Sequence, residues 1–243
     1  MPRFDDHFIE AHRGASGSFP ENTMLAFAEA AKAGARSIET DLSLLADDNF
    51  AIFHDATLGR TVSGDAEIGS LDTAALAGLD AGIWRDAAFA RQPVPTIDEA
   101  LAWQAQTGIG FNWEMKCHHD DYPRHARALK AALRRAAPRH TLVSSFDDEC
   151  LAAIRAIMPD IALALIAEPL PGDWREQAAR LSLDGVHLDH STMTAADARA
   201  VKSAGLALRC YTVNDAADIE RIKALGVDMA MTDWPDRFAA QYG

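Results

Sequence analysis

Short apolar segments alternate with longer amphipathic segments along the whole chain. The short segments are rich in Ile, Val, Leu and Phe and predict buried strands over residues 8–11, 35–41, 50–53, 108–115, 141–146, 161–167, 185–188, 206–213 and 229–232. The longer segments are rich in Ala and repeat their apolar residues at helical spacing. They predict helices over residues 22–33, 96–107, 123–137, 147–157, 174–183, 193–204 and 215–225.

Several predicted helices carry recognisable signals at their ends. Thr96 is followed three residues later by Glu99, which is the pattern of a capping box, and Asn214-Asp215 opens the helix over 215–225. Glycine follows the ends of others, at Gly34, Gly108, Gly205 and Gly226. The end signals therefore agree with the hydrophobic periodicity.

The order of the predicted elements indicates the fold class. Strict strand–helix alternation requires right-handed crossovers and a parallel sheet. About eight such units favour a single closed (β/α)8 TIM barrel. A doubly wound open sheet is the alternative, and the lack of a Gly-x-Gly-x-x-Gly motif after the first strand weakens it. We predict one domain over residues 1–243, with a small insertion at about 54–95 after the second barrel strand, containing a short hairpin and a helix.

The composition narrows the classes of partner. Hydrophobic residues make up 49% of the chain, which is enough for a large core. The formal net charge is −13, from 36 acidic and 23 basic residues, so most of the surface repels nucleic acids and anionic membranes. We therefore expect no nucleic-acid partner and no stable membrane association. An anionic small-molecule substrate would need a local positive site.

The expected compartment is reducing and cytoplasmic. The 3 cysteines are an odd number without metal-binding spacing, which is typical of reduced thiols. Residues 1–10 contain no apolar segment like that of a signal peptide. No apolar run reaches the roughly 18 residues that a membrane-spanning helix needs.

Polar residues that could act in catalysis or metal binding gather where predicted strands end. In TIM barrels, catalytic side chains lie at the carboxyl ends of the strands and in the loops that follow. Here those positions hold His12, Arg13, Glu39, Asp41, His54, Asn112, Glu114 and Lys116. Each residue alone has a structural explanation, such as a solvated carboxylate or a hydrogen-bonded histidine. Their joint occurrence on neighbouring strands favours a functional site.

Three carboxylates in this group predict a metal site. Glu39 and Asp41 are two residues apart and therefore share one face of a strand, and Glu114 lies between Trp113 and Met115 in an apolar strand. Carboxylates that converge on one point repel each other unless a cation is present. Hard oxygen ligands select Mg²⁺ or Ca²⁺. We predict one divalent cation, either Mg²⁺ or Ca²⁺.

Two histidines and two cations complete the expected chemistry. Cleavage of a phosphodiester needs one group to deprotonate the attacking oxygen and another to protonate the leaving alkoxide. His12 and His54 have the side chain suited to both roles. Arg13 and Lys116 would neutralise the charge that grows on the phosphoryl oxygens.

These residues lie in motifs that resemble those of the glycerophosphodiester phosphodiesterase family. The resemblance covers nearly the whole chain and includes the cytosolic bacterial type of the family. The matching segments are His12-Arg13-Gly14, Pro20-Glu21-Asn22-Thr23, Glu39-Thr40-Asp41, His54-Asp55 with Leu58 and Arg60-Thr61, Asp80-Ala81-Gly82 with Trp84, Asn112-Trp113-Glu114-Met115-Lys116, Ser144-Ser145-Phe146, His187-Leu188 with His190, Tyr211-Thr212-Val213-Asn214, Gly226-Val227-Asp228 and Thr232-Asp233.

The resemblance implies a TIM barrel and a metal-dependent hydrolase that releases sn-glycerol 3-phosphate and an alcohol. It implies that the hydroxyl adjacent to the phosphoester attacks phosphorus and that water then opens the cyclic phosphate. The implied site has catalytic His12 and His54, metal ligands Glu39, Asp41 and Glu114, and phosphate-binding Arg13 and Lys116. Phe19 and Tyr211 are expected to line the pocket, with packing in the core as the alternative.

Two other functions are compatible with the same barrel. A phosphodiesterase acting on lysophospholipids would need an apolar rim, which Ile83, Trp84 and Phe89 could form unless they pack as a small satellite core. A non-catalytic barrel that binds glycerophosphodiesters is disfavoured because both histidines and all three carboxylates are present. The sequence leaves open the head group, the choice between Mg²⁺ and Ca²⁺, the order in which the histidines act and the oligomeric state.

Overall fold

A computed structural model describes residues 7–119, 121–138 and 140–242. Its parallel strands are β1 (Ile9–His12), β2 (Ser37–Leu44), β4 (Gly110–Lys116), β5 (Thr141–Ser145), β6 (Ala162–Ala167), β7 (Gly185–Asp189), β8 (Ala207–Tyr211) and β9 (Met229–Thr232). β1 pairs in parallel with both β2 and β9, and this double pairing closes the sheet into a barrel. The predicted (β/α)8 barrel is confirmed. Residues 1–6, which belong to the segment without a predicted signal peptide, lie outside the described residues.

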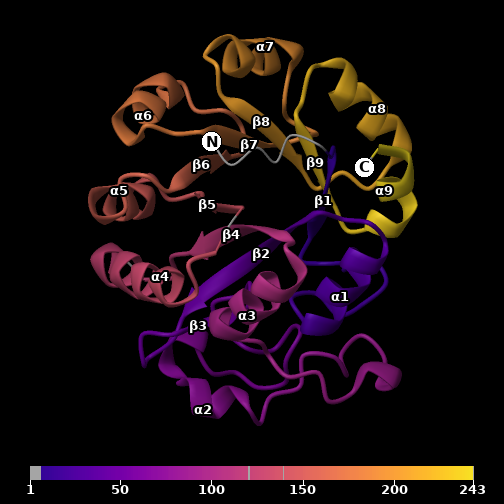
Figure 1. Ribbon diagram of the computed structural model, residues 1–243, viewed down its shortest axis with the longest axis vertical. Helices are drawn as coiled ribbons and strands as arrows, with labels where there is room; N and C mark the ends of the chain where they lie inside the picture. Colours follow the sequence, from indigo (N-terminus) through magenta and orange to yellow (C-terminus); the bar gives the residue numbers. More distant parts are fainter. Residues whose placement is uncertain (1–6, 120, 139, 243) are drawn as a thin grey trace.

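Helices surround the strands as an outer ring (Figure 1). They are α1 (Met24–Lys32), α3 (Ile97–Thr107), α4 (Tyr122–Ala136), α5 (Asp148–Ile157), α6 (Trp174–Leu181), α7 (Ala195–Ser203), α8 (Ala216–Ala224) and α9 (Pro235–Tyr242). The sequence patterns predict all of these except α9, which is short and begins at a proline. Phe238 of α9 is buried with Ile9 of β1, so this last helix covers the point where the barrel closes. Among the described residues, no helix combines the length and apolar character needed to cross a bilayer.

The predicted caps form at the expected helix ends. Thr96 and Glu99 make both hydrogen bonds of a capping box at the start of α3, and Gly108 ends that helix with a φ of 74°. The Asp215 side chain accepts from the backbone N–H of Ala217 at the start of α8. Such caps satisfy backbone groups that a helix end would otherwise leave unpaired. They fix where these helices begin and end.

Along β2 and β4, side chains point alternately into the hydrophobic core beneath the helices and into the barrel interior. On β4, Phe111, Trp113 and Met115 pack in the hydrophobic core beneath the helices, and the intervening residues point inward. Ile38 and Leu42 of β2 join the same core. Because side chains alternate between the faces of a strand, burying these residues under the helices directs the intervening carboxylates into the barrel.

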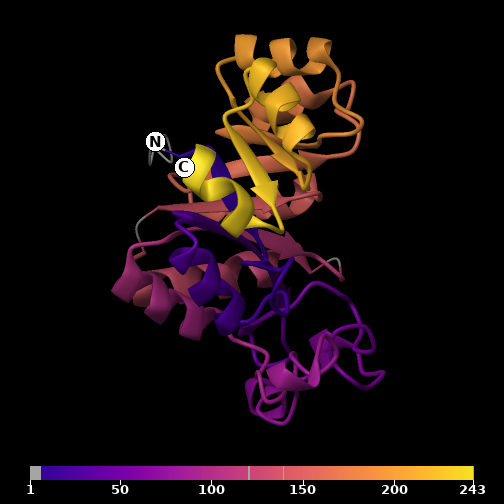
Figure 2. The same cartoon turned by 90° about the vertical axis from the view of Figure 1, so that its right-hand side faces the viewer.

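A further strand and an insertion separate β2 from α3. β3 (Phe50–Ile52) pairs antiparallel with β2 and so lies outside the barrel. The chain then forms an antiparallel bridge between Thr57 and Glu67, a single turn η1 (Ile68–Ser70), the short helix α2 (Thr73–Leu76) and a second turn η2 (Ala87–Phe89). Both views show this segment as a lobe beside α1 and α3 (Figures 1 and 2). The predicted insertion, with its hairpin and helix, is confirmed.

The insertion has its own small core and contacts the loop after β1. Buried residues of this core are Leu45, Ala51, Phe53, Leu58, Val62, Ile68, Leu76, Ala81 and Val94. Of the three residues predicted as either a rim or a satellite core, Phe89 packs against Phe19 with ring centroids 5.7 Å apart, whereas Ile83 and Trp84 are exposed. Arg85 donates to the carbonyl oxygens of Ser16, at 2.9 Å, and Gly17. The insertion thereby stabilises the loop that follows His12.

Candidate active site

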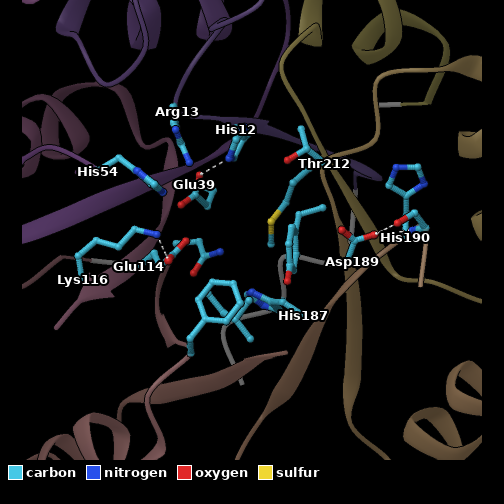
Figure 3. A pocket seen from close by; sticks show the side chains of 16 residues that line it. His12, Arg13, Glu39, His54, Glu114, Lys116, His187, Asp189, His190 and Thr212 are labelled. Carbon is cyan, nitrogen blue, oxygen red and sulfur yellow. Dashed lines mark hydrogen bonds and ion pairs between the residues drawn. The ribbon is translucent and has the colours of Figure 1, made fainter. Parts of the chain in front are cut away.

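A cavity of about 430 Å³ opens at the carboxyl ends of the strands, as expected for a barrel active site (Figure 3). Its lining includes most of the predicted site residues, namely His12, Arg13, Glu39, His54, Glu114, Lys116 and Tyr211. Asp41 is fully buried and lies behind this lining. Phe19 is also outside the lining and packs against the core and Phe89, which is the alternative that the sequence left open for it.

Three buried carboxylates converge at one side of the cavity, where Glu39 and Glu114 line it and Asp41 lies behind them. Glu39, Asp41 and Glu114 each offer an oxygen, and these oxygens lie within 4.8 Å of one another. β2 and β4 are in register, with Asp41 beside Glu114, so the alternation of both strands produces this convergence. Both oxygens of Glu39 are buried without a hydrogen-bond donor among the described residues.

Burial and mutual repulsion act on the carboxylates unequally. Burial, together with the charges of Asp41 and Glu114, raises the pKa of Glu39 well above its usual range. Burial also opposes ionisation of Asp41, but the cations of Arg13 and Lys116 outweigh it and hold the pKa of Asp41 below its usual value. The carboxylates of the cluster therefore repel one another, and a bound cation would reduce this repulsion.

Two basic side chains lie against the cluster. Arg13 Nε is 3.0 Å from Asp41 Oδ2, Lys116 Nζ is 3.1 Å from Asp41 Oδ1, and Lys116 also donates to Glu114. Gly14, with a φ of 83°, makes the turn that aims Arg13, since a Cβ at this position would lie 2.7 Å from the Ala26 backbone. The two cations extend from the carboxylates to the cavity surface and are placed to contact an anion there.

His12 is oriented by a carboxylate from the opposite end of the chain. Its Nδ1 lies 2.6 Å from Asp233 Oδ1, and its Nε2 faces Glu39 Oε2 at 3.8 Å. Asp233 also accepts from Ser16 Oγ at 2.9 Å and from Asn214 Nδ2 at 2.7 Å. Because a carboxylate only accepts hydrogen bonds, Nδ1 carries a proton and Nε2 is presented to the cavity. The Thr232-Asp233 motif contains Asp233 but does not by itself indicate a role for it.

We expect Asp233 to make stability depend on pH in the acid range. Burial raises its pKa, but the hydrogen bond from His12 and other contacts outweigh this and lower the pKa from 3.8 to about 2. A carboxyl with a depressed pKa stabilises the fold above its unfolded pKa, and this contribution disappears as pH falls through the folded value. The difference corresponds to about 2 kcal/mol.

Urea unfolding at a series of pH values from 5 to 2.5 measures this effect. The free energy of unfolding of the wild type should fall more steeply below pH 4 than that of the Asp233→Asn variant. Asp65→Asn, an exposed change in the insertion, is the matched control and should behave as the wild type. Parallel pH profiles for wild type and Asp233→Asn would contradict the interpretation.

His54 is held by a chain of ion pairs that leads back to Arg13. Its Nδ1 lies 2.7 Å from Asp55 Oδ1, and Arg60 donates to the other oxygen of Asp55 at 2.7 Å. Arg60 also donates to both oxygens of Glu21 at 2.8 Å, and Arg13 donates to Glu21 at 2.8 Å. Each histidine therefore has a carboxylate at Nδ1, and the network couples His54 to Arg13. Burial, with smaller contributions from Arg13 and Lys116, lowers the pKa of His54.

The remaining wall is aromatic and polar. Phe146 and Tyr211 meet edge to face with ring centroids 6.1 Å apart, and both line the cavity with Asp189 and His187. Below them, Glu10 and Arg209 form a buried ion pair at 2.8 Å. No role was predicted for Phe146, His187 or Asp189. Each lies at or beside the end of a predicted strand, and this position is the signal in the sequence that could have identified them.

The fold and the cavity together define a class of enzyme. The site offers a buried carboxylate cluster suited to a hard cation, two imidazoles held by carboxylates and two cations directed at one point. These groups can hold a phosphoryl group and move protons to and from its ester oxygens. This arrangement defines a barrel hydrolase that acts on phosphate esters.

Comparisons with known proteins identify the family. The model of the Glycerophosphoryl diester phosphodiesterase family matches residues 12–237. A glycerophosphodiester phosphodiesterase of Bacillus subtilis is 30% identical, covering 94% of this chain and 84% of the relative. The chain belongs to the glycerophosphodiester phosphodiesterase family, and it is a phosphodiesterase.

Solved structures agree with this assignment. The structure of an Oleispira antarctica phosphodiesterase in complex with the product sn-glycerol-3-phosphate has a TM-score of 0.91 and 31% identity, over 96% of this chain and 95% of that one. A glycerophosphodiester phosphodiesterase from Agrobacterium tumefaciens has a TM-score of 0.80 and 28% identity, over 96% and 99% of the two chains.

Proposed function

We propose that this enzyme hydrolyses glycerophosphodiesters to sn-glycerol 3-phosphate and an alcohol, with a divalent cation as cofactor. The observation that carries the proposal is the cluster of Glu39, Asp41 and Glu114 beside two histidines whose Nδ1 atoms are held by carboxylates. The product-bound Oleispira antarctica relative supports the same substrate class.

The three carboxylates fit a resident Mg²⁺ or Ca²⁺. Both oxygens of Glu39 are buried without hydrogen-bond donors among the described residues, and such oxygens are costly to leave without a partner. Both ions favour an all-oxygen ligand set. When bound, the cation would supply positive charge to the phosphoryl oxygens and make a neighbouring hydroxyl more acidic.

The side chains of the protein perform the proton transfers. In the first step, one histidine accepts the proton of the glycerol hydroxyl adjacent to the phosphoester, and that oxygen forms a bond to phosphorus. The bond from phosphorus to the leaving oxygen breaks, and the other histidine donates a proton to the alcohol. In the second step, water opens the cyclic phosphate and the two histidines exchange roles. Arg13 and Lys116 contact the phosphoryl oxygens throughout.

A coupled assay of glycerol 3-phosphate release tests the proposal. Purified enzyme is incubated with glycerophosphocholine, then with EDTA, then with Mg²⁺ or Ca²⁺ restored. We expect release that EDTA abolishes and one of the two ions restores, because the carboxylates alone repel the phosphate. Release unaffected by EDTA after exhaustive dialysis would refute the metal requirement, and no release with either ion would refute the substrate class.

One observation supports a second candidate substrate. Ile83 and Trp84 are exposed on the insertion, and an apolar rim of this kind suits an enzyme that acts on lysophospholipids. Micellar lysophosphatidylcholine in the same assay separates the two. Rates matching those for glycerophosphocholine would favour the lipid substrate, whereas much slower release would favour the water-soluble diester.

A further inference from the structure

Opposite sides of the cavity carry different groups. Arg13 and Lys116 lie with the carboxylate cluster and the catalytic histidines on one side, and Asp189 lies across the cavity from them (Figure 3). A phosphodiester bound beside Arg13, Lys116 and the proposed metal would direct its leaving alcohol along the cavity. The charge on the side of Asp189 therefore affects which leaving alcohols the enzyme accepts.

Asp189 presents an ionised carboxylate to the cavity. It ends β7, and its strand partner across the β7–β8 pairing is Tyr211. Its Oδ1 accepts two hydrogen bonds from Ser191, through the backbone N–H and the hydroxyl, both at 2.6 Å. Burial raises the pKa of Asp189, but the hydrogen bonds from Ser191 and Thr192 outweigh it and lower the pKa.

Among the described residues, no Lys or Arg is paired with this carboxylate, and the neighbouring His190 lowers its pKa less than the hydrogen bonds from Ser191 and Thr192 do. Within residues 7–119, 121–138 and 140–242, Asp189 forms an ion pair with no Lys or Arg. Arg221 contacts the neighbouring His190, but its charge is paired with Asp218 at 2.9 Å. The Glu10–Arg209 pair beneath the cavity is neutral overall. Asp189 is therefore available to a cation that enters with a ligand.

Two aromatic rings, those of Phe146 and Tyr211, line the cavity together with Lys116 and Asp189. Phe146 is 52% exposed, Lys116 Nζ lies 5.8 Å from its ring centroid, and Tyr211 packs against it edge to face. The Tyr211 hydroxyl donates to the Ala167 carbonyl at 3.2 Å, which holds the ring in place. Aromatic faces beside a carboxylate provide the combination that attracts quaternary and primary ammonium groups.

We propose that Asp189, Phe146 and Tyr211 form a subsite for a positively charged nitrogen on the leaving alcohol. The enzyme then prefers glycerophosphodiesters of ammonium-bearing alcohols, such as choline and ethanolamine, over those of uncharged polyols. Such substrates are zwitterions, and their phosphate and ammonium groups match the two sides of the cavity. This inference rests on the proposed function and specifies its substrate class.

The test compares kcat/KM for glycerophosphocholine and glycerophosphoglycerol in the metal-supplemented wild type and in Asp189→Asn. Asparagine keeps the Oδ1 acceptor for Ser191 and removes only the charge. We expect kcat/KM for glycerophosphocholine to fall about tenfold, which is typical for loss of one partly desolvated cation contact. The value for glycerophosphoglycerol should change less than about twofold. Asp65→Asn is the matched control for the change in net charge.

A second variant tests the aromatic part of the subsite. Phe146→Leu keeps an apolar side chain and removes the aromatic face, and it should also reduce the preference for glycerophosphocholine. Equal losses on both substrates in Asp189→Asn would overturn the proposal, because the carboxylate would then face the glycerol half that they share. Unchanged kinetics on both would overturn it as well. If the wild type cleaves neither diester, the proposed function itself fails, so the two failures are distinct.

Discussion

Replacing His12 or His54 with alanine should lower kcat by about a hundred- to ten-thousand-fold, the usual contribution of one general acid or base. Each imidazole has its Nδ1 against a carboxylate, Asp233 or Asp55, and can exchange protons only through Nε2. Since both proton transfers occur in each half of the reaction, loss of either histidine should affect turnover more than KM. Glycerol 3-phosphate release under saturating glycerophosphocholine measures the effect.

The histidine variants should retain the fold. His12 and His54 side chains are 17% and 35% exposed at the cavity, so alanine leaves no closed void. Circular dichroism and thermal unfolding check this. His119→Ala is a suitable control, because His119 is exposed and outside the residues that line the cavity. Near-wild-type turnover in either His12→Ala or His54→Ala would show that the assigned proton transfers are wrong.

The second large effect concerns Glu39→Gln, which should be more stable than the wild type without metal and less stable than the wild type with metal. In the metal-free protein, Glu39→Gln should raise the free energy of unfolding on the order of 1 kcal/mol, because it removes a buried charge that faces two other carboxylates. With saturating metal the order should invert. A cation at about one hundred times its Kd stabilises the wild type by about 2.7 kcal/mol, and most of this gain should be lost in the variant. Activity should be lost with it.

The raised pKa of Glu39 determines how the stability difference between Glu39→Gln and the wild type changes with pH. Burial, followed by the charges of Asp41 and Glu114, raises the pKa of Glu39 above its ordinary value of 4.5. A carboxyl with a raised pKa favours the fold below its unfolded pKa, and that contribution disappears as pH rises through the folded value. The stability advantage of Glu39→Gln without metal should therefore grow above about pH 4.5.

Thermal unfolding of wild type and Glu39→Gln in EDTA, and then in Mg²⁺ or Ca²⁺, tests the reversal. Glu67→Gln, an exposed change in the insertion, is the matched control and should respond to metal as the wild type does. If metal stabilises Glu39→Gln as much as the wild type, Glu39 is not a ligand. If the metal-free variant is less stable at every pH, the repulsion inferred for the cluster is absent.

Local patterns were sufficient to predict the barrel and the centre of its site. Apolar Phe111, Trp113 and Met115 alternate with polar residues along β4, and a period of two assigns the polar set, including Glu114, to the barrel interior. The same rule applies to Glu39 and Asp41 on β2. Caps at Thr96 and Asp215 fixed helix starts for an equally local reason, since a side chain satisfies backbone donors two or three residues away.

Contacts between distant segments depended on the tertiary structure. His12 and Asp233 are 221 positions apart, and they meet only because β1 pairs with β9 when the barrel closes. The antiparallel pairing of β3, the packing of Phe19 under the insertion and the position of Asp189 opposite Lys116 also depend on how elements assemble. Periodicity and capping report the environment of a residue along its own strand or helix. They carry no information on which distant element faces it. The sequence by itself therefore determined the proposed catalytic groups, and barrel closure decided what orients them and what shapes the remainder of the cavity.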